Sequence, residues 1–171
     1  SRKVGCSVSS HAPISRAAYR FMTEQGLIGE KTERIEGVVI EKMSKSPKHS
    51  AIGSIIQKIL SPALSNDYTR RVEQPFAIGE SDPEPDLAIV KGVPEESFTE
   101  HLNSAELVIE IANTSLELDR DKAEIYARGK VPRYLIVNLK ENEVEDYSLP
   151  VAGVYTRKEI NRSGELSLWP D

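Results

Sequence analysis

Two acidic residues stand in the sequence where a metal-binding pair could be built. Asp86 follows a proline directly in front of the apolar run 87–90, and Glu110 lies inside the apolar run LVIEIA at 107–112. Burying an unpaired carboxylate among apolar neighbours is costly, so Glu110 needs a partner. A proline suits the entry to a strand because it donates no ladder hydrogen bond, and a strand would hold Asp86 rigidly beside other acids.

The alternation of side chains along a strand brings the two acids together. Glu110 points away from the face of its two flanking isoleucines. If the segment 85–90 pairs alongside, Asp86 and Glu110 converge at one end of the sheet. Neighbouring carboxylates repel each other unless a cation or a proton lies between them. Mg²⁺ prefers oxygen ligands and retains waters, and Mn²⁺ fits the same ligands, so the pair predicts a metal site.

Two other interpretations of these acids stay open. In the first, Glu110 faces solvent on a half-covered sheet and Asp86 is an ordinary turn residue. In the second, the two acids are the paired carboxylates of a glycosidase. The aromatic content of 6% argues against the second, because sugar-binding clefts stack aromatic rings on their substrates.

A lysine and a histidine are candidates for the rest of the site. A metal-held phosphodiester needs a nearby positive charge, and Lys122 lies on the helix predicted after the Glu110 strand, on one face with Tyr126. The alternative is that Lys122 is only solvated. His49 lies at the start of an isoleucine-rich helix, where it either approaches a phosphate or metal, or caps the helix.

Hydrophobic periodicity and turn residues predict the elements that position these side chains. Ser15 and Ser115 are expected to cap helices, and Trp169 is expected to close over the core. Helices are predicted for 15–25, 46–60 and 115–129, and strands or strand pairs for 34–43, 69–79, 85–90, 106–112, 132–139, 143–149 and 151–171. This order predicts an α/β (α+β) fold with a mixed β-sheet flanked by helices.

One helix carries a clear apolar stripe. Five large apolar residues recur at helical spacing and are predicted to share a single buried face: Ile52, Ile55, Ile56, Ile59 and Leu60. Pro62 is expected to end this helix.

Length and composition bound the class of protein. A chain of 171 residues is expected to form a single domain, 1–171. Cys6 is the only cysteine, so a disulfide framework or a thiolate zinc site is excluded and a cytoplasmic location is expected. The longest apolar run is too short to span a membrane. The sequence contains neither a glycine-rich dinucleotide turn nor a Walker phosphate loop.

Charge is distributed unevenly along the chain. The net charge is −5, but residues 1–79 carry 12 Lys and Arg against 7 Asp and Glu, while residues 80–171 carry 10 against 20. A basic surface beside an acidic one suits a metal-dependent phosphodiesterase. From charge alone, solvated helix faces are the favoured explanation.

Several separate motifs appear in the order of a known family. The segments IEGVVIEKM, SPKHS, VEQPFAIGESDPEPDLAIVKG and LVIEIANTSLELDRDKAEIYARGKVPRYLIVNL resemble the Uma-type family of restriction-endonuclease-like proteins. The resemblance covers about 33–150, and the family belongs to the PD-(D/E)XK nuclease superfamily. It implies a mixed sheet flanked by helices, Mg²⁺-dependent cleavage of DNA, and a homodimer that cuts two strands.

The resemblance also implies roles for individual residues. Asp86 matches the aspartate of the PD motif and Glu110 matches the second acid, and both would bind the metal. Ala112 occupies the position of the superfamily lysine. The family resembles other members of the superfamily in which that lysine has moved to the following helix, and Lys122 is the matching residue here. It would stabilise the phosphate or orient the attacking water.

Two further residues match supporting positions of the family. His49 matches a histidine after the first strands, and Gln74 matches the glutamine of the following strand. The chain departs from the family at Val38, where an acid is usual, and the nearby glutamates 33, 36 and 41 are candidate substitutes. This departure favours an alternative, namely a catalytically silent module of the same fold that binds nucleic acid or a protein partner.

Overall fold

The computed structural model describes residues 12–92 and 101–163. Its helices are α1 (Arg16–Glu24), α2 (Pro47–Leu60) and α3 (Leu116–Arg128), with a short 3₁₀ turn, η1 (Ser61–Ala63), after α2. Its strands are β1 (Thr32–Ile35), β2 (Val38–Glu41), β3 (Tyr68–Val72), β4 (Leu87–Lys91), β5 (Leu107–Ala112), β6 (Arg133–Asn138), β7 (Glu143–Val151) and β8 (Val154–Asn161). The predicted mixed sheet with flanking helices is confirmed.

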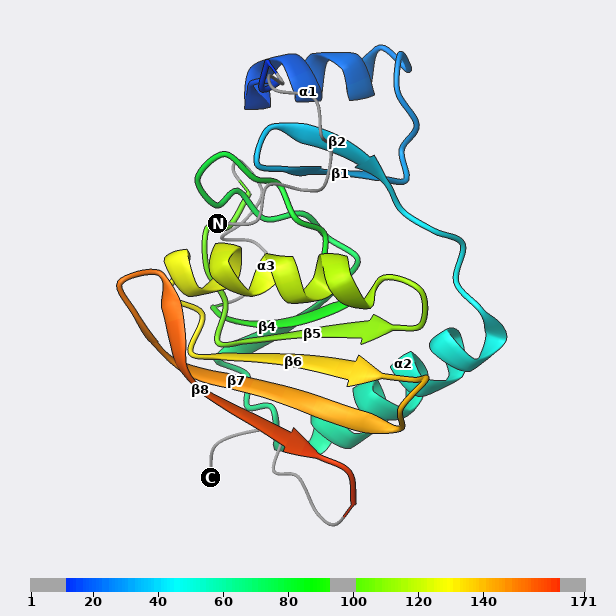
Figure 1. Ribbon diagram of the computed structural model, residues 1–171, viewed down its shortest axis with the longest axis vertical. Helices are drawn as coiled ribbons and strands as arrows, with labels where there is room; N and C mark the ends of the chain where they lie inside the picture. The colour runs from blue at the N-terminus through cyan, green and yellow to red at the C-terminus, as the bar shows by residue number, and fades with distance from the viewer. Residues whose placement is uncertain (1–11, 93–100, 164–171) are drawn as a thin grey trace.

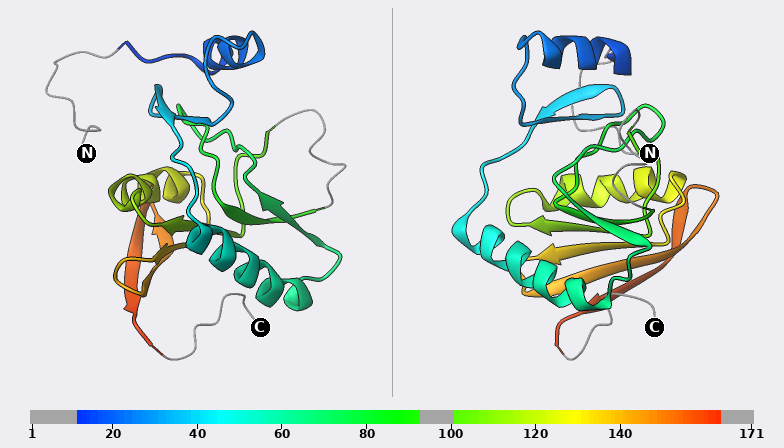
Figure 2. Two further views of the ribbon diagram at one scale, coloured as in Figure 1. Left: turned by 90° about the vertical axis from the view of Figure 1, so that its right-hand side faces the viewer. Right: turned by 180° about the vertical axis from the view of Figure 1, so that it is seen from behind.

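A six-stranded sheet forms the centre of the fold. Its strands follow the order β3-β4-β5-β6-β7-β8, and β5 and β6 are the one parallel pair in this sheet. Helix α3 connects these two strands and covers one face, while α2 lies across the other (Figures 1 and 2). The C-terminal ends of β5 and β6 therefore lie near the start of α3. Figure 1 shows that α2 also begins at this end of the strands.

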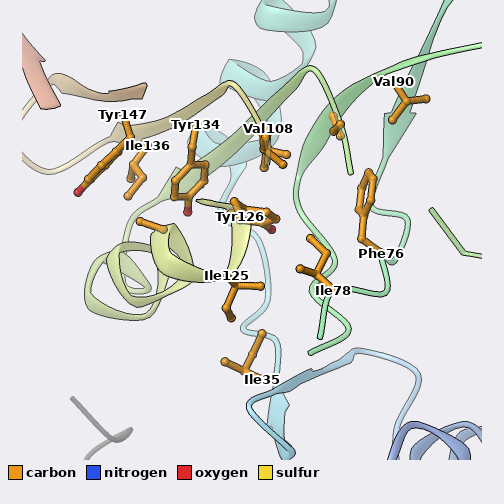
Figure 3. Packing of buried hydrophobic residues seen from close by; sticks show 14 of the residues in the cluster. Ile35, Phe76, Ile78, Val90, Val108, Ile125, Tyr126, Tyr134, Ile136 and Tyr147 are labelled. Carbon is orange, nitrogen blue, oxygen red and sulfur yellow. The ribbon is translucent and has the colours of Figure 1, made fainter. Parts of the chain in front are cut away.

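Each face of the sheet packs its own hydrophobic core, because the central strands alternate between them. Leu87 and Ile109 pack with Ile56 and Leu60 of α2. On the opposite face, tyrosines of α3, β6 and β7 pack with aliphatic residues of β4 and β5 (Figure 3). Both faces of β5 are buried, so the sheet supplies a rigid and dry support for Glu110.

A separate two-stranded ribbon, β1–β2, stands beside the α3 face (Figure 1, top). Its two-residue turn has positive φ at Glu36 and Gly37, as a tight hairpin turn requires. A Cβ on Gly37 would lie 2.5 Å from the Cβ of Pro13, so no side chain fits there. Ile35 joins the core against α3, and Arg34 pairs with Asp82 at 2.5 Å. These contacts fix Glu33 over the sheet.

The apolar stripe of α2 is narrower than predicted. Ile56 and Leu60 are buried, but Ile55 and Ile59 are 51% and 57% exposed. The helix rests on the sheet along a thin line of contact, so the neighbouring ridge of isoleucines faces outward.

The two predicted serine caps differ. Ser15 accepts the predicted hydrogen bond from Ala18 N–H. The Ser115 hydroxyl makes no capping bond and instead donates to the Asp119 carboxylate at 2.6 Å.

Trp169, which was expected to close over the core, lies outside the described residues. In the described part of the chain, no helix has both the length and the apolar character needed to cross a membrane.

Candidate active site

Asp86 and Glu110 lie side by side where β4 and β5 begin to separate. Leu87 pairs with Ile109, so Asp86 and Glu110 are the next two residues in the antiparallel register. Their side chains replace the ladder bonds at this point. Glu110 Oε1 accepts a hydrogen bond from Asp86 N–H at 2.9 Å, and Asp86 Oδ2 accepts one from Ile111 N–H at 2.7 Å. Both carboxylates are therefore fixed by backbone donors.

Lys122 reaches the acids from α3. Its ammonium lies 2.8 Å from Glu110 Oε2, 2.9 Å from Glu33 and 3.6 Å from Asp119 Oδ1. All four side chains are buried. Three carboxylates thus surround one ammonium, and the cluster carries more acid than base.

The pKa values of the cluster reflect this excess. Burial raises the pKa of Glu110 well above its usual value; the Lys122 ammonium opposes this, while neighbouring carboxylates add to it. Burial likewise raises the pKa of Asp119 to about 6. Burial would lower the pKa of Lys122, but the carboxylates of Glu110, Glu33 and Asp119 outweigh burial and raise it. Lys122 is a permanent cation, and the acids around it would be stabilised by further positive charge.

Asp86 has a different environment because two basic side chains reach it from the segment around the start of α2. His49 Nε2 lies 3.3 Å from Asp86 Oδ2, and Lys45 Nζ lies 3.4 Å from Oδ1. Burial would raise the pKa of Asp86, but the hydrogen bonds from His49 and Ile111 outweigh burial and lower it. Asp86 is therefore held as the ionised acid of the pair. Lys45 also pairs with Glu73 and is 31% exposed.

A cavity of about 210 Å³ opens onto these groups. It lies between the β1–β2 ribbon, the start of α2 and the start of α3, next to the C-terminal end of β5. Its walls carry the acids, His49 and three lysines, together with the loop 113–115; the third lysine is Lys42, which pairs with Glu84. A charged group that enters this cavity meets carboxylates and ammonium groups at once.

The oxygen donors of the site suit a divalent cation in number and kind rather than as a ready-made cluster. Within residues 12–92 and 101–163, no group of three or more His, Cys, Asp or Glu side chains is arranged to hold a metal ion. Asp86 and Glu110 nevertheless each direct one oxygen at an ammonium and the other at a backbone N–H. Two carboxylates facing cations fit Mg²⁺, which commonly uses one or two carboxylates and keeps several waters.

Four of the five predicted site residues line this cavity, namely Asp86, Glu110, Lys122 and His49. Gln74 does not: its side chain is exposed and lies away from the cavity walls. The backbone of Glu73 has a φ of +51°, and it is Glu73 that pairs with Lys45.

The structure adds two residues that sequence reasoning did not place in the site, Asp119 and Lys45, and it selects Glu33 among three candidates. Asp119 lies three residues before Lys122, and helical spacing could have identified it. Glu33 was one of three candidate glutamates, and its buried contact with Lys122 distinguishes it from the other two, which are exposed. Lys45 lies in an irregular segment before α2, where no periodic pattern could indicate its direction.

Comparisons with known proteins identify the family and the fold. A family model named Uma2 and described as "Putative restriction endonuclease" matches residues 26–170. No curated protein matches the chain. The chain is similar to a solved structure titled as a putative nuclease belonging to DUF820 from Anabaena variabilis, with 21% identity and a TM-score of 0.66. The similarity covers 86% of this chain and 84% of that one, and at this identity it shows the fold.

Proposed function

The chain belongs to the Uma2 family of restriction-endonuclease-like proteins, and from this premise we propose that it is a divalent-metal-dependent endonuclease that hydrolyses phosphodiester bonds in DNA. The observation that carries the proposal is the pairing of Asp86 with Glu110 at the ends of β4 and β5, with Lys122 against Glu110. A structural role alone would not explain why buried acids outnumber buried bases beside an open cavity.

Asp86 and Glu110 are the residues that would hold the metal, Mg²⁺ or alternatively Mn²⁺. When bound, such an ion lowers the pKa of its waters and neutralises charge on a phosphate. Asp86 suits the role because its pKa is lowered, so it is ionised at neutral pH. Glu110 suits it because its raised pKa falls when a cation is near.

The remaining residues of the site hold the two carboxylates in position or contact the phosphate. Lys122 holds the Glu110 carboxylate in place and places a permanent positive charge in the wall of the cavity. His49 contacts the Asp86 oxygen that also accepts the Ile111 N–H, and so fixes its orientation. Lys45 is the most exposed of the three lysines that line the cavity, so it is the lysine best placed to contact an incoming phosphate.

Two measurements test the proposal. Calorimetry with Mg²⁺ and with Mn²⁺ measures metal binding, and conversion of supercoiled plasmid to nicked and linear forms measures cleavage. We expect binding of at least one ion and cleavage that chelation abolishes. If millimolar metal does not bind and DNA is still bound but never cut, the protein is the catalytically silent module instead.

Two features of the proposal concern the assembly and the substrate. A homodimer would place one such site on each strand of a DNA duplex. Light scattering at micromolar protein concentration measures the molar mass and so the oligomeric state. A monomer at that concentration would contradict the dimer without affecting the chemistry at Asp86. DNA as the substrate is tested against RNA of the same sequence in the same cleavage assay.

A further inference from the structure

A second cavity, of about 300 Å³, lies on the other side of Asp86. It is enclosed by α2, by the end of β3 and by the face of the sheet that α2 covers. Asp86, His49, Lys45 and Ile111 line both cavities. Asp86 and the two basic side chains therefore form a wall that both cavities share. The first cavity lies on the α3 side of this wall, and the second lies beneath α2.

The walls of the second cavity differ in kind from those of the first. Ile56 of α2 and Leu87 and Ile109 of the sheet give it apolar surfaces on facing sides. Gln57 adds a side-chain amide, which both donates and accepts hydrogen bonds. Lys45, His49 and Asp86 lie at the end shared with the first cavity, and Glu73, which lines the second cavity alone, is paired with Lys45. This combination suits a flat group with apolar faces and polar edges, joined to an anion.

A glycine keeps this cavity open. Gly53 lies on α2 where a Cβ would be 3.5 Å from Ile111 Cδ1, an ordinary contact distance. Glycine in the middle of a helix costs about 1 kcal/mol relative to alanine. A larger side chain at this position would extend into the space between α2 and β5.

We propose that the second cavity takes one unstacked nucleobase of the strand whose phosphate lies at Asp86, so that the protein prefers single-stranded or unpaired DNA. This inference rests on the proposed function, and it names the form of the substrate. A chain with its phosphate at the shared wall has its next base within reach of the second cavity. A base inside an intact duplex stays in the stack, and it must be extruded to enter a pocket.

The inference is tested by comparing three forms of one oligonucleotide: single-stranded, fully paired, and paired with one mismatch. Each carries 2-aminopurine, whose fluorescence rises on unstacking, and binding is measured by fluorescence anisotropy in a chelator. We expect single-stranded and mismatched DNA to bind about tenfold more tightly than the duplex, a difference of about 1.4 kcal/mol. Fluorescence should rise on binding at one position only.

Variants locate the effect in the cavity. Gly53→Leu fills it and should abolish the tenfold preference while leaving duplex binding unchanged. Ala51→Leu is the matched control, because it adds the same side chain at an exposed position of α2 outside both cavities. If Gly53→Leu does not fold, Gln57→Leu keeps the size of the side chain and removes its amide, and should reduce the preference at least threefold.

The outcomes separate this inference from the proposed chemistry. If the parent protein cuts duplex and single strands equally and Gly53→Leu changes nothing, the base pocket is wrong and the nuclease stands. If the single-strand preference and its loss in Gly53→Leu are seen without any cleavage, the pocket stands and the chemistry fails. Absence of binding to every form in the chelator overturns the base pocket, and absence of cleavage of every form with Mg²⁺ and with Mn²⁺ overturns the nuclease.

Discussion

Asp86 and Glu110 each have one carboxylate oxygen on the backbone of the facing strand. Glu110 Oε1 accepts from the N–H of Asp86, and Asp86 Oδ2 accepts from the N–H of Ile111, the residue after Glu110. The last residues of β4 and β5 that pair through their backbones are Leu87 and Ile109. Beyond them, these two side-chain hydrogen bonds continue the pairing of the strands. The two acids are thus held as firmly as the sheet itself, and the other oxygen of each is directed at a lysine.

Asp86→Asn should remove metal-dependent cleavage while the fold persists. An asparagine oxygen can still accept the N–H of Ile111, so the strand pairing is retained. The negative charge facing Lys45 is lost, however, and we expect the cleavage rate to fall by about 10² or more. Initial rates of plasmid nicking and calorimetric metal titration measure the two effects. Asp67→Asn, at an exposed position, is the control and should match the parent.

Lys122→Met should destabilise the protein strongly. The variant leaves three buried carboxylates without their cation, and breaking a buried ion pair costs about 3–5 kcal/mol. For a domain of this size each kcal/mol lowers Tm by about 2–4 °C, so thermal unfolding should show a drop of about 10 °C. This replaces the expectation for a hydrated lysine, whose loss would barely change stability.

A second substitution tests the cause of that loss. Glu33→Gln removes one carboxylate from the cluster, so adding it to Lys122→Met should restore part of the lost Tm. Lys91→Met, at the exposed far end of β4, should leave Tm unchanged. Equal Tm values for Lys122→Met and the parent would show that the buried cluster is not held by this charge.

Lys45→Ala should weaken DNA binding without unfolding the protein. Lys45 is partly exposed, so its ion pairs with Glu73 and Asp86 contribute little to stability. A lysine that binds a phosphate releases about one counterion, so the slope of log affinity against log salt should become shallower by about 1. Anisotropy titrations over a salt series measure the slope. The same slope in Lys45→Ala and in the parent would exclude a phosphate contact, and Lys91→Ala serves as the control.

Glu145 should make stability depend on pH in the acid range. Burial would raise the pKa of Glu145, but hydrogen bonds from Arg120, Tyr147 and Lys158 outweigh burial and lower it. The folded state thus favours the ionised carboxylate more than the unfolded chain does. Its contribution is full above the unfolded pKa, about 4.5, and is lost as pH falls through the lower folded pKa.

Chemical denaturation of Glu145→Gln measures this contribution. The variant should be less stable than the parent at pH 7, and the difference should shrink once pH falls below the unfolded pKa of about 4.5 and toward the lower folded pKa. Glu141→Gln, an exposed change nearby, should follow the parent at every pH. A stability difference that stays constant over the whole acid range in which the fold persists would rule out this ionisation as its source.

The pairing of the two acids could be predicted because it depends on local patterns. The proline before Asp86 marks the start of a strand, and alternation within 107–112 sets the face of Glu110. Lys122 could be placed because helical spacing after β5 fixes its direction. These three residues lie on regular elements whose periods are visible in the sequence.

The contribution of Glu33 could not be predicted with the same certainty. It lies on the β1–β2 ribbon, which is not part of the main sheet, and its position depends on tertiary contacts such as Arg34 with Asp82. The direction of Gln74 depends on the irregular backbone at Glu73. Hydrophobic periodicity indicates neither the position of Glu33 nor the direction of the Gln74 side chain, since both depend on tertiary structure and on irregular backbone.

The site has a consequence for how the protein is made. Lys122 bonds to Glu33, which is 89 residues away in the chain, and to Glu110, which is 12 residues away. Chains emerge from the ribosome N-terminus first, so these contacts cannot form until α3 has been synthesised. A nascent chain that ends before α3 has both proposed metal ligands but no Lys122 to hold them. The proposed activity would therefore require synthesis of the chain through α3, so that shorter unfinished chains would not cut DNA.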